Sequence, residues 1–185
     1  MSKLETNQVD PASGTTLTLG TSGDTIAIPS GVTIANSGTA TGFGGDNTPA
    51  FLVSNTANNT GKTDNAYSKM TYNVETFDTD SAFASSKFTV PTGEGGKYFF
   101  SVTEFLVGDS AGCVDSFVNL YKNGSNAVGQ NGNDFDFSNY SPTFSAVLDL
   151  SAGDYIEVYC KVNVSSGTWG QYAGGIWQGF KLIGV

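Results

Sequence analysis

The chain of 185 residues is long enough for one all-β domain with an appended segment, but not for two large domains. Its 8 Lys plus Arg are outnumbered by 17 Asp plus Glu, and the net charge of −9 makes nucleic acid a poor partner because the phosphate backbone would be repelled. Because the chain has no histidine, the usual serine hydrolase, zinc and Cys–His arrangements are excluded.

The first segment, residues 1–12, has no apolar stretch of the kind that a secretory signal needs, and no part of the chain approaches the length of a membrane span. We therefore expect a protein that is made in a cytoplasm and does not insert into a membrane. Residues 1–12 are interpreted as an attachment segment. Cys113 and Cys160 are expected to be free buried thiols, and a single disulfide across the sandwich is the alternative.

Residues 13–44 contain an internal repeat whose four units open with Ser-Gly: SGTTLTLG, SGDTIAIP, SGVTIANS and SGTATGFG. Units this short hold one strand and a turn, so they must stack or wind with other chains to bury their aliphatic side chains. We predict a β-rich trimeric stalk in which three copies point these side chains at a shared axis; a flexible linker is the alternative. The stalk-axis candidates are Leu17, Leu19, Ile26, Ile28, Val32 and Ile34.

A glycine-rich segment at residues 41–49 ends the repeat, and we place the start of a second domain, residues 49–185, there. Short apolar runs then recur at regular intervals with turn signals between them and no helix-period segment, which is typical of a β-sandwich. Residues 56–68 and 165–175 are expected to be exposed loops. Strands are expected over residues 50–55, 69–75, 83–90, 97–107, 113–122, 127–129, 142–150, 155–164 and 175–183.

The strand expected at residues 97–107 is apolar on both faces. Alternation divides its apolar side chains into two sets: Tyr98, Phe100, Val102 and Leu106, and Phe99, Phe105 and Val107. A sandwich buries only one face of each of its sheets, so one of the two sets needs another cover. We expect that cover to be another copy of the same chain.

Seven short motifs, in order and at consistent spacing, carry a resemblance to a known family. They are PAF at 49–51, KMTYN at 69–73, KFTVP at 87–91, GKYFFS at 96–101, VNLYKNG at 118–124, AVLDL at 146–150 followed by AGD at 152–154, and QGFKL at 178–182. With them, residues 49–185 resemble the complement C1q-like, tumour-necrosis-factor-like jelly roll. The resemblance implies a sandwich of about ten strands that trimerises, with aromatic faces packed around a threefold axis.

The resemblance also suggests which aromatic residues serve the core or the trimer interface. These candidates are Tyr98, Phe99, Phe100, Phe105, Trp177 and Phe180. The repeats ahead of such a domain, without an export signal, are similar to those of fibre or appendage proteins of tailed bacteriophages, especially marine ones. The implied location is the virion surface after release by lysis. The implied partners are two further copies, other virion proteins at the amino terminus, and a host-surface saccharide or receptor.

Two pairs of carboxylates, Asp78 with Asp80 and Asp134 with Asp136, have the composition that glycoside hydrolysis requires. Both pairs lie in polar segments without a recognisable flanking motif, so we interpret them as solvated loop residues. The oxygen-rich segment 131–136 would also suit a hard cation, and calcium at Asp134 and Asp136 is kept as a hypothesis. No other cofactor is expected.

Trp169 and Tyr172 lie in the expected loop 165–175, where exposed rings could stack on sugars or contact a receptor. The sequence thus predicts a non-enzymatic, trimeric virion protein whose jelly-roll head attaches to a host surface. Two alternatives stay open. One is a capsid decoration or head-fibre protein without receptor binding, and the other is a carbohydrate-active enzyme that uses Asp134 and Asp136.

Overall fold

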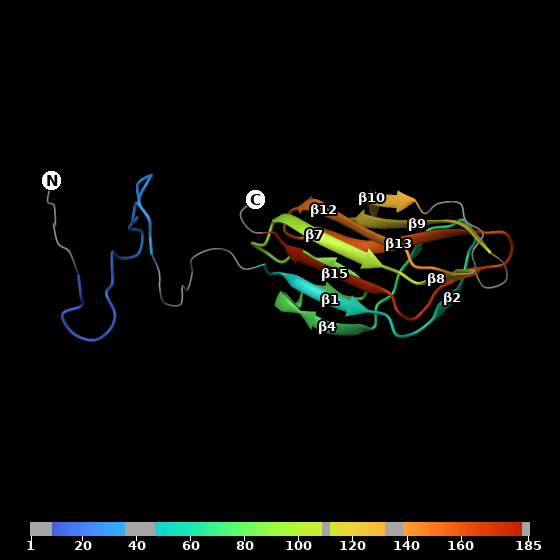
Figure 1. The fold of residues 1–185 in the computed structure, drawn as a ribbon, viewed down its shortest axis with the longest axis horizontal. Helices are drawn as coiled ribbons and strands as arrows, with labels where there is room; N and C mark the ends of the chain where they lie inside the picture. Colours follow the sequence, from blue (N-terminus) through green and yellow to red (C-terminus); the bar gives the residue numbers. More distant parts are fainter. Residues whose placement is uncertain (1–8, 36–46, 109–111, 132–138, 183–185) are drawn as a thin grey trace. The chain divides into compact units, whose positions relative to one another are not determined.

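A computed structural model of the chain describes residues 9–35, 47–108, 112–131 and 139–182 (Figure 1). The chain divides into two compact units, Met1–Thr41 and Gly42–Val185. In the described residues of the first unit, 9–35, no strand is assigned, and the six stalk-axis candidates are between 42% and 61% exposed. The β-stalk would need further copies of the chain, and it stays a prediction.

The described residues of the second unit form fifteen strands and one short 3-10 helix, η1 (Thr79–Ser81). The strands are β1 (Ala50–Ser54), β2 (Asn59–Lys62), β3 (Ser68–Lys69), β4 (Val74–Asp78), β5 (Phe83–Ala84), β6 (Lys87–Thr89), β7 (Gly96–Thr103), β8 (Leu106–Gly108), β9 (Cys113–Lys122), β10 (Ser125–Asn131), β11 (Asn139–Tyr140), β12 (Thr143–Leu150), β13 (Tyr155–Val164), β14 (Trp169–Gln171) and β15 (Ile176–Lys181). No helix in this described part is both long and apolar enough to cross a membrane.

The strands pair antiparallel in three sheets. A five-stranded sheet has the order β12-β7-β15-β1-β4, and Figure 1 shows these strands side by side from top to bottom. A six-stranded sheet follows the path β10-β9-β13-β6-β5, with β3 also paired to β13. The remaining four strands form a sheet in the order β11-β8-β14-β2. The all-β sandwich expected from the sequence is therefore confirmed.

The core lies between the five-stranded and six-stranded sheets and is rich in aromatic rings. Alternation along β7 turns Tyr98 and Phe100 inward, where both are fully buried. Phe51 of β1 stacks on Phe88 of β6 at 5.1 Å between ring centroids, which joins the two sheets. Trp177 of β15 meets Phe51 edge-on at 5.0 Å. These contacts bury large apolar areas and dominate the stability of the domain.

Several expected strands are interrupted, and two expected loops contain strands. Ser85 and Ser86 both have positive φ, 53° and 56°, so the chain reverses there and splits the strand expected at 83–90 into β5 and β6. The expected loop 56–68 contains β2 and the start of β3, and the expected loop 165–175 contains β14. These two segments were predicted to be loops because their residues are mostly polar. In the structure, the backbone of β14 pairs with β2 and β8, which are distant in the sequence.

Cys113 and Cys160 are both buried and free, which confirms the predicted free thiols. Burial raises the pKa of each thiol, so both stay protonated at neutral pH.

Candidate interaction surfaces

An apolar row crosses the outer face of the five-stranded sheet. The strand register makes Val147, Phe99, Phe180 and Ala50 direct cross-strand neighbours, in that order, and we call them the apolar row. The rings of Phe99 and Phe180 lie 5.4 Å apart. Val147 is 52% exposed. A chain on its own therefore leaves a continuous apolar strip on this face, where a solvated sheet would carry polar side chains.

The remainder of this face mixes apolar and polar side chains. Phe77 of β4 and Ile176 of β15 are 47% and 44% exposed. Small polar residues Ser145, Ser101 and Gln178 separate Ile176 from the apolar row. The Thr103 and Thr143 hydroxyls, 2.9 Å apart, lie in register with Ile176. An apolar centre with small polar neighbours is the composition of a surface that contacts another protein.

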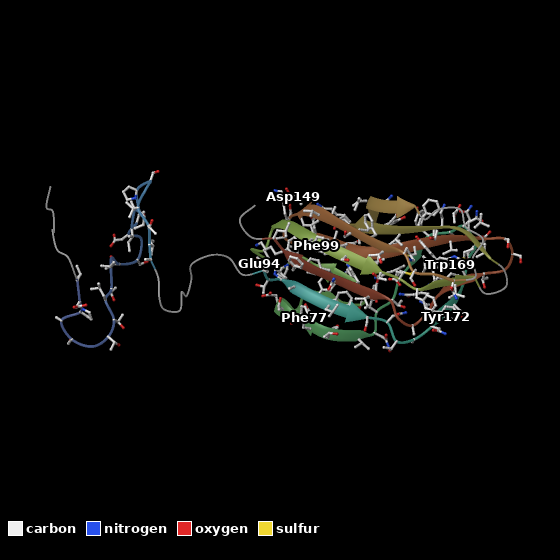
Figure 2. The ribbon with its side chains drawn as sticks, in the orientation of Figure 1. Phe77, Glu94, Phe99, Asp149, Trp169 and Tyr172 are labelled. Atoms are coloured by element: carbon white, nitrogen blue, oxygen red, sulfur yellow. The ribbon has the colours of Figure 1, made fainter. Side chains whose placement is uncertain are left out.

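Charged pairs mark the end of this sheet at which β7 begins. Lys181 contacts Glu94 at 2.8 Å, and Lys97 lies 4.0 Å from Asp149. Figure 2 labels Glu94 and Asp149 at this end and Phe99 and Phe77 on the strands of the same sheet. Exposed pairs of this kind contribute little stability, but they place charges of both signs at the rim of the apolar row.

The six aromatic candidates for core or interface divide into two groups. Tyr98, Phe100 and Trp177 are fully buried within the chain itself. Phe99, Phe180 and Phe105 are half-buried, and of these Phe99 and Phe180 belong to the apolar row. Phe105 instead packs edge-on against Tyr172 at 6.3 Å.

Trp169 is not an exposed contact residue, and this prediction was wrong. Its side chain is fully buried, and its indole Nε1 donates a hydrogen bond to the Thr63 carbonyl oxygen at 2.8 Å. The Lys62 ammonium lies 5.7 Å from the ring centroid. The reason is that β14 is a strand between β8 and β2 rather than a loop, so its tryptophan is covered by neighbouring chain.

Tyr172 follows β14 and is half-buried. Its backbone N–H donates to the Phe105 carbonyl oxygen at 2.7 Å. Its ring is partly accessible, so Tyr172 stays a candidate contact residue.

The carboxylate pairs give no site within the described residues. Asp134 and Asp136, the calcium and enzyme candidates, lie outside the residues that the structure describes. Both carboxylate oxygens of Asp78 accept backbone hydrogen bonds, from Ala82 and Phe83 at 3.0 Å each. Asp78 therefore orders the turn after β4. In the described part of the chain, no group of three or more potential metal ligands is found.

A buried carboxylate, Glu104, was missed by the sequence reasoning. The side-chain amide of Gln171 donates to its Oε2 at 2.9 Å, and the Tyr72 hydroxyl donates to its Oε1. Burial raises the pKa of Glu104 from its ordinary value of 4.5 to about 7, although these hydrogen bonds and Lys62 act in the opposite direction. The signal was present, since Glu104 shares the alternation phase of the inward-facing Val102 and Leu106.

Comparison with known proteins identifies the fold only. No family model and no curated protein matches the chain. Among solved structures, the globular domain of zebrafish complement 1qA protein is 17% identical and has a TM-score of 0.48, with 72% of this chain and 97% of that chain covered. The Eiger TNF of S. frugiperda is 14% identical and has a TM-score of 0.54, with 72% of this chain and 91% of that chain covered. The likeness to the Eiger TNF identifies the second unit as an all-β domain with a TNF-like jelly-roll fold.

Proposed function

We propose that this chain is a structural virion protein: a homotrimeric fibre or appendage of a tailed bacteriophage whose jelly-roll head attaches to a host surface. The apolar row is the observation that carries the assembly part of the proposal. Val147 is exposed and Phe99 and Phe180 are half-buried, so one chain leaves this strip partly uncovered. Two further copies around a threefold axis would cover it, and C1q/TNF-like domains typically form homotrimers.

The amino-terminal repeats support the same assembly. Their aliphatic side chains are exposed in a single chain, so they gain burial only from other chains. Three copies would hold these side chains against one another as a stalk, with residues 1–12 bound to other virion proteins. Virion location and phage origin rest on the composition of the repeats.

The proposed mechanism of attachment is geometric. Three identical heads on one stalk present three copies of each surface contact, and simultaneous engagement raises the overall affinity above that of one head. Tyr172 is one candidate contact residue, whereas Trp169 is buried and is not a candidate. No catalytic step is part of this mechanism.

Light scattering on the full-length chain tests the assembly. The expected mass is three times that of the 19.3 kDa chain. A stable monomer at micromolar concentration would reject both stalk and fibre. Antibody labelling of virus particles that carry this protein then tests its placement: label on the tail supports attachment, and label on the icosahedral head supports capsid decoration.

A further inference from the structure

The outer face of the six-stranded sheet carries a line of four aromatic rings. Tyr121 of β9 and Tyr159 of β13 stack with centroids 4.1 Å apart. Tyr67, just before β3, lies 5.9 Å from Tyr121, and Phe117 of β9 meets the Tyr67 ring edge-on at 6.4 Å. We call Tyr67, Phe117, Tyr121 and Tyr159 the tyrosine face.

The tyrosine face differs in chemistry from the apolar row on the opposite sheet. Tyr67 is 40% exposed, and the other three rings are half-buried. The exposed large apolar side chains of the five-stranded sheet are valine, isoleucine and phenylalanine, which suit another apolar protein surface. Tyrosine combines a flat apolar ring with a hydroxyl, so it suits a ligand with an apolar face and a polar edge.

Polar groups beside the rings hold the tyrosine face in place. The side-chain amide nitrogen of Asn119, which is buried in the sheet, donates to the Tyr67 hydroxyl at 3.2 Å. The Lys161 ammonium lies 4.1 Å from the Phe117 centroid and 5.5 Å from the Tyr67 centroid. Among the described residues, no carboxylate lies within ion-pair distance of Lys161.

Lysines gather on this sheet although the chain as a whole is strongly acidic. Strands β3, β6, β9 and β13 contribute Lys69, Lys87, Lys122 and Lys161, out of 8 Lys plus Arg in the chain. Lys69 pairs with Glu157 at 2.7 Å and Lys122 with Asp154 at 2.8 Å. Lys87 and Lys161 instead lie over aromatic rings, so their ammonium groups keep hydrogen bonds to offer a ligand anion.

From this arrangement we infer that the tyrosine face binds an acidic saccharide, a sugar chain that carries uronic-acid carboxylates. The C–H face of a pyranose packs on the Tyr67 ring, and its hydroxyls bond to the tyrosine hydroxyls. A uronate carboxylate pairs with the Lys161 ammonium beside the rings. The inference rests on the proposed function, because it supplies the ligand class for host attachment.

The net charge of −9 does not prevent this binding. At physiological ionic strength, charges more than about 8 Å apart are largely screened, so the lysine nearest to the carboxylate decides the local interaction. Binding is therefore expected to weaken as salt is added and to favour acidic over neutral sugars.

Titration calorimetry of the full-length chain with short oligomers of galacturonate, mannuronate and glucuronate tests the inference, and neutral glucose oligomers are the comparator. We expect at least one uronate series to bind roughly tenfold more tightly than the neutral oligomer at low salt. Tyr67→Ala removes the most exposed ring and is expected to reduce uronate affinity roughly tenfold. Tyr67→Phe keeps the ring and is expected to reduce uronate affinity less than Tyr67→Ala does.

Lys161→Met keeps an apolar stem over the rings and removes the charge, so it is expected to abolish the preference for acidic sugars. The matched control is Lys97→Met, on the other sheet, where the side chain is 47% exposed; it should leave affinity unchanged. Near-UV circular dichroism checks that each variant retains its fold.

Failure of all three uronate series to bind overturns the inference, and so does equal affinity for neutral glucose oligomers. Unchanged affinity in both Tyr67→Ala and Lys161→Met overturns the placement on the tyrosine face. Light scattering of the same samples separates this inference from the proposed function. A monomer that binds uronates with the expected variant pattern rejects the homotrimeric stalk and fibre but keeps the tyrosine face as the binding site. A homotrimer that binds no uronate rejects only the tyrosine face as a binding site.

Discussion

In the core of the jelly roll, the Tyr72 hydroxyl donates a hydrogen bond to the carboxylate of Glu104. Glu104 lies between β7 and β8, and its second oxygen accepts from Gln171 of β14 at 2.9 Å. One buried acid therefore connects three segments that are far apart in the sequence. In addition to the effect of burial, Lys62 lowers the pKa of Glu104, and the Glu104 charge in turn raises the pKa of Tyr72 and of Cys160.

Glu104→Gln is expected to remove a pH dependence of stability. Because the pKa of Glu104 is about 7 when folded and about 4.5 when unfolded, the folded chain binds more protons between these values. The free energy of unfolding therefore falls as the pH rises from about 4.5 to about 7, by about 3 kcal/mol at most. Urea unfolding of the original chain and of Glu104→Gln at pH 5 and pH 8 measures the change in the free energy of unfolding. An equal change with pH in the two proteins would contradict the prediction.

Gly179→Ala is expected to destabilise the core. A Cβ at this position would lie 2.6 Å from the Phe100 ring and 2.9 Å from the Phe51 ring, closer than atoms can approach. Overpacking of this kind costs roughly 1–3 kcal/mol. The matched control is Gly95→Ala, whose Cβ would make ordinary contacts from 3.5 Å outwards. Thermal unfolding should separate the two variants; equal midpoints would show that the rings can move aside.

Val147→Glu is expected to dissociate the proposed homotrimer. It places a charge in the apolar row, and three such charges would come together near the proposed axis without partners. Val114→Glu is the control, because Val114 is also an exposed valine, at 38%, but lies on β9 of the other sheet. Light scattering should give monomers for the first variant and trimers for the second. Trimers for both would place the interface elsewhere.

Asp154→Asn is expected to reduce stability at neutral pH. Lys122 at 2.8 Å, the Asn123 amide at 2.7 Å and the Ser151 N–H at 2.8 Å hold the pKa of Asp154 at about 2. An acid with a lowered pKa stabilises the fold above its unfolded pKa, and that contribution is lost as the pH falls from about 4 to about 2.

The loss in Asp154→Asn should be about 1 kcal/mol or less, since pairs near the surface are screened by solvent. Chemical unfolding at pH 7 and pH 2.5 measures it. If the free energies of unfolding of the original chain and of Asp154→Asn differ as much at pH 2.5 as at pH 7, the effect comes from packing and not from the charge of Asp154.

Local patterns in the sequence were sufficient for most of the strands and for the fold class. Residues 113–122 and 155–164 were predicted as strands with the bounds that β9 and β13 have. These predictions succeeded because alternation with a period of two and nearby turn residues act over a few residues. That Tyr98, Phe100 and Val102 share one face was predicted for the same reason, whereas the structure shows that this face is the inward one.

The tertiary structure decided which side chains of distant segments meet. Trp169 looked like a loop residue, and only the pairing of β14 with β8 and β2 buries it. Glu104 was not singled out from the sequence, and the hydrogen bonds from Tyr72 and Gln171 make it a hydrogen-bonded core residue. The sequence by itself determined the alternation and the positions of most of the strands. Strand register, which depends on contacts between remote residues, determined the apolar row, the buried acid and the tyrosine face.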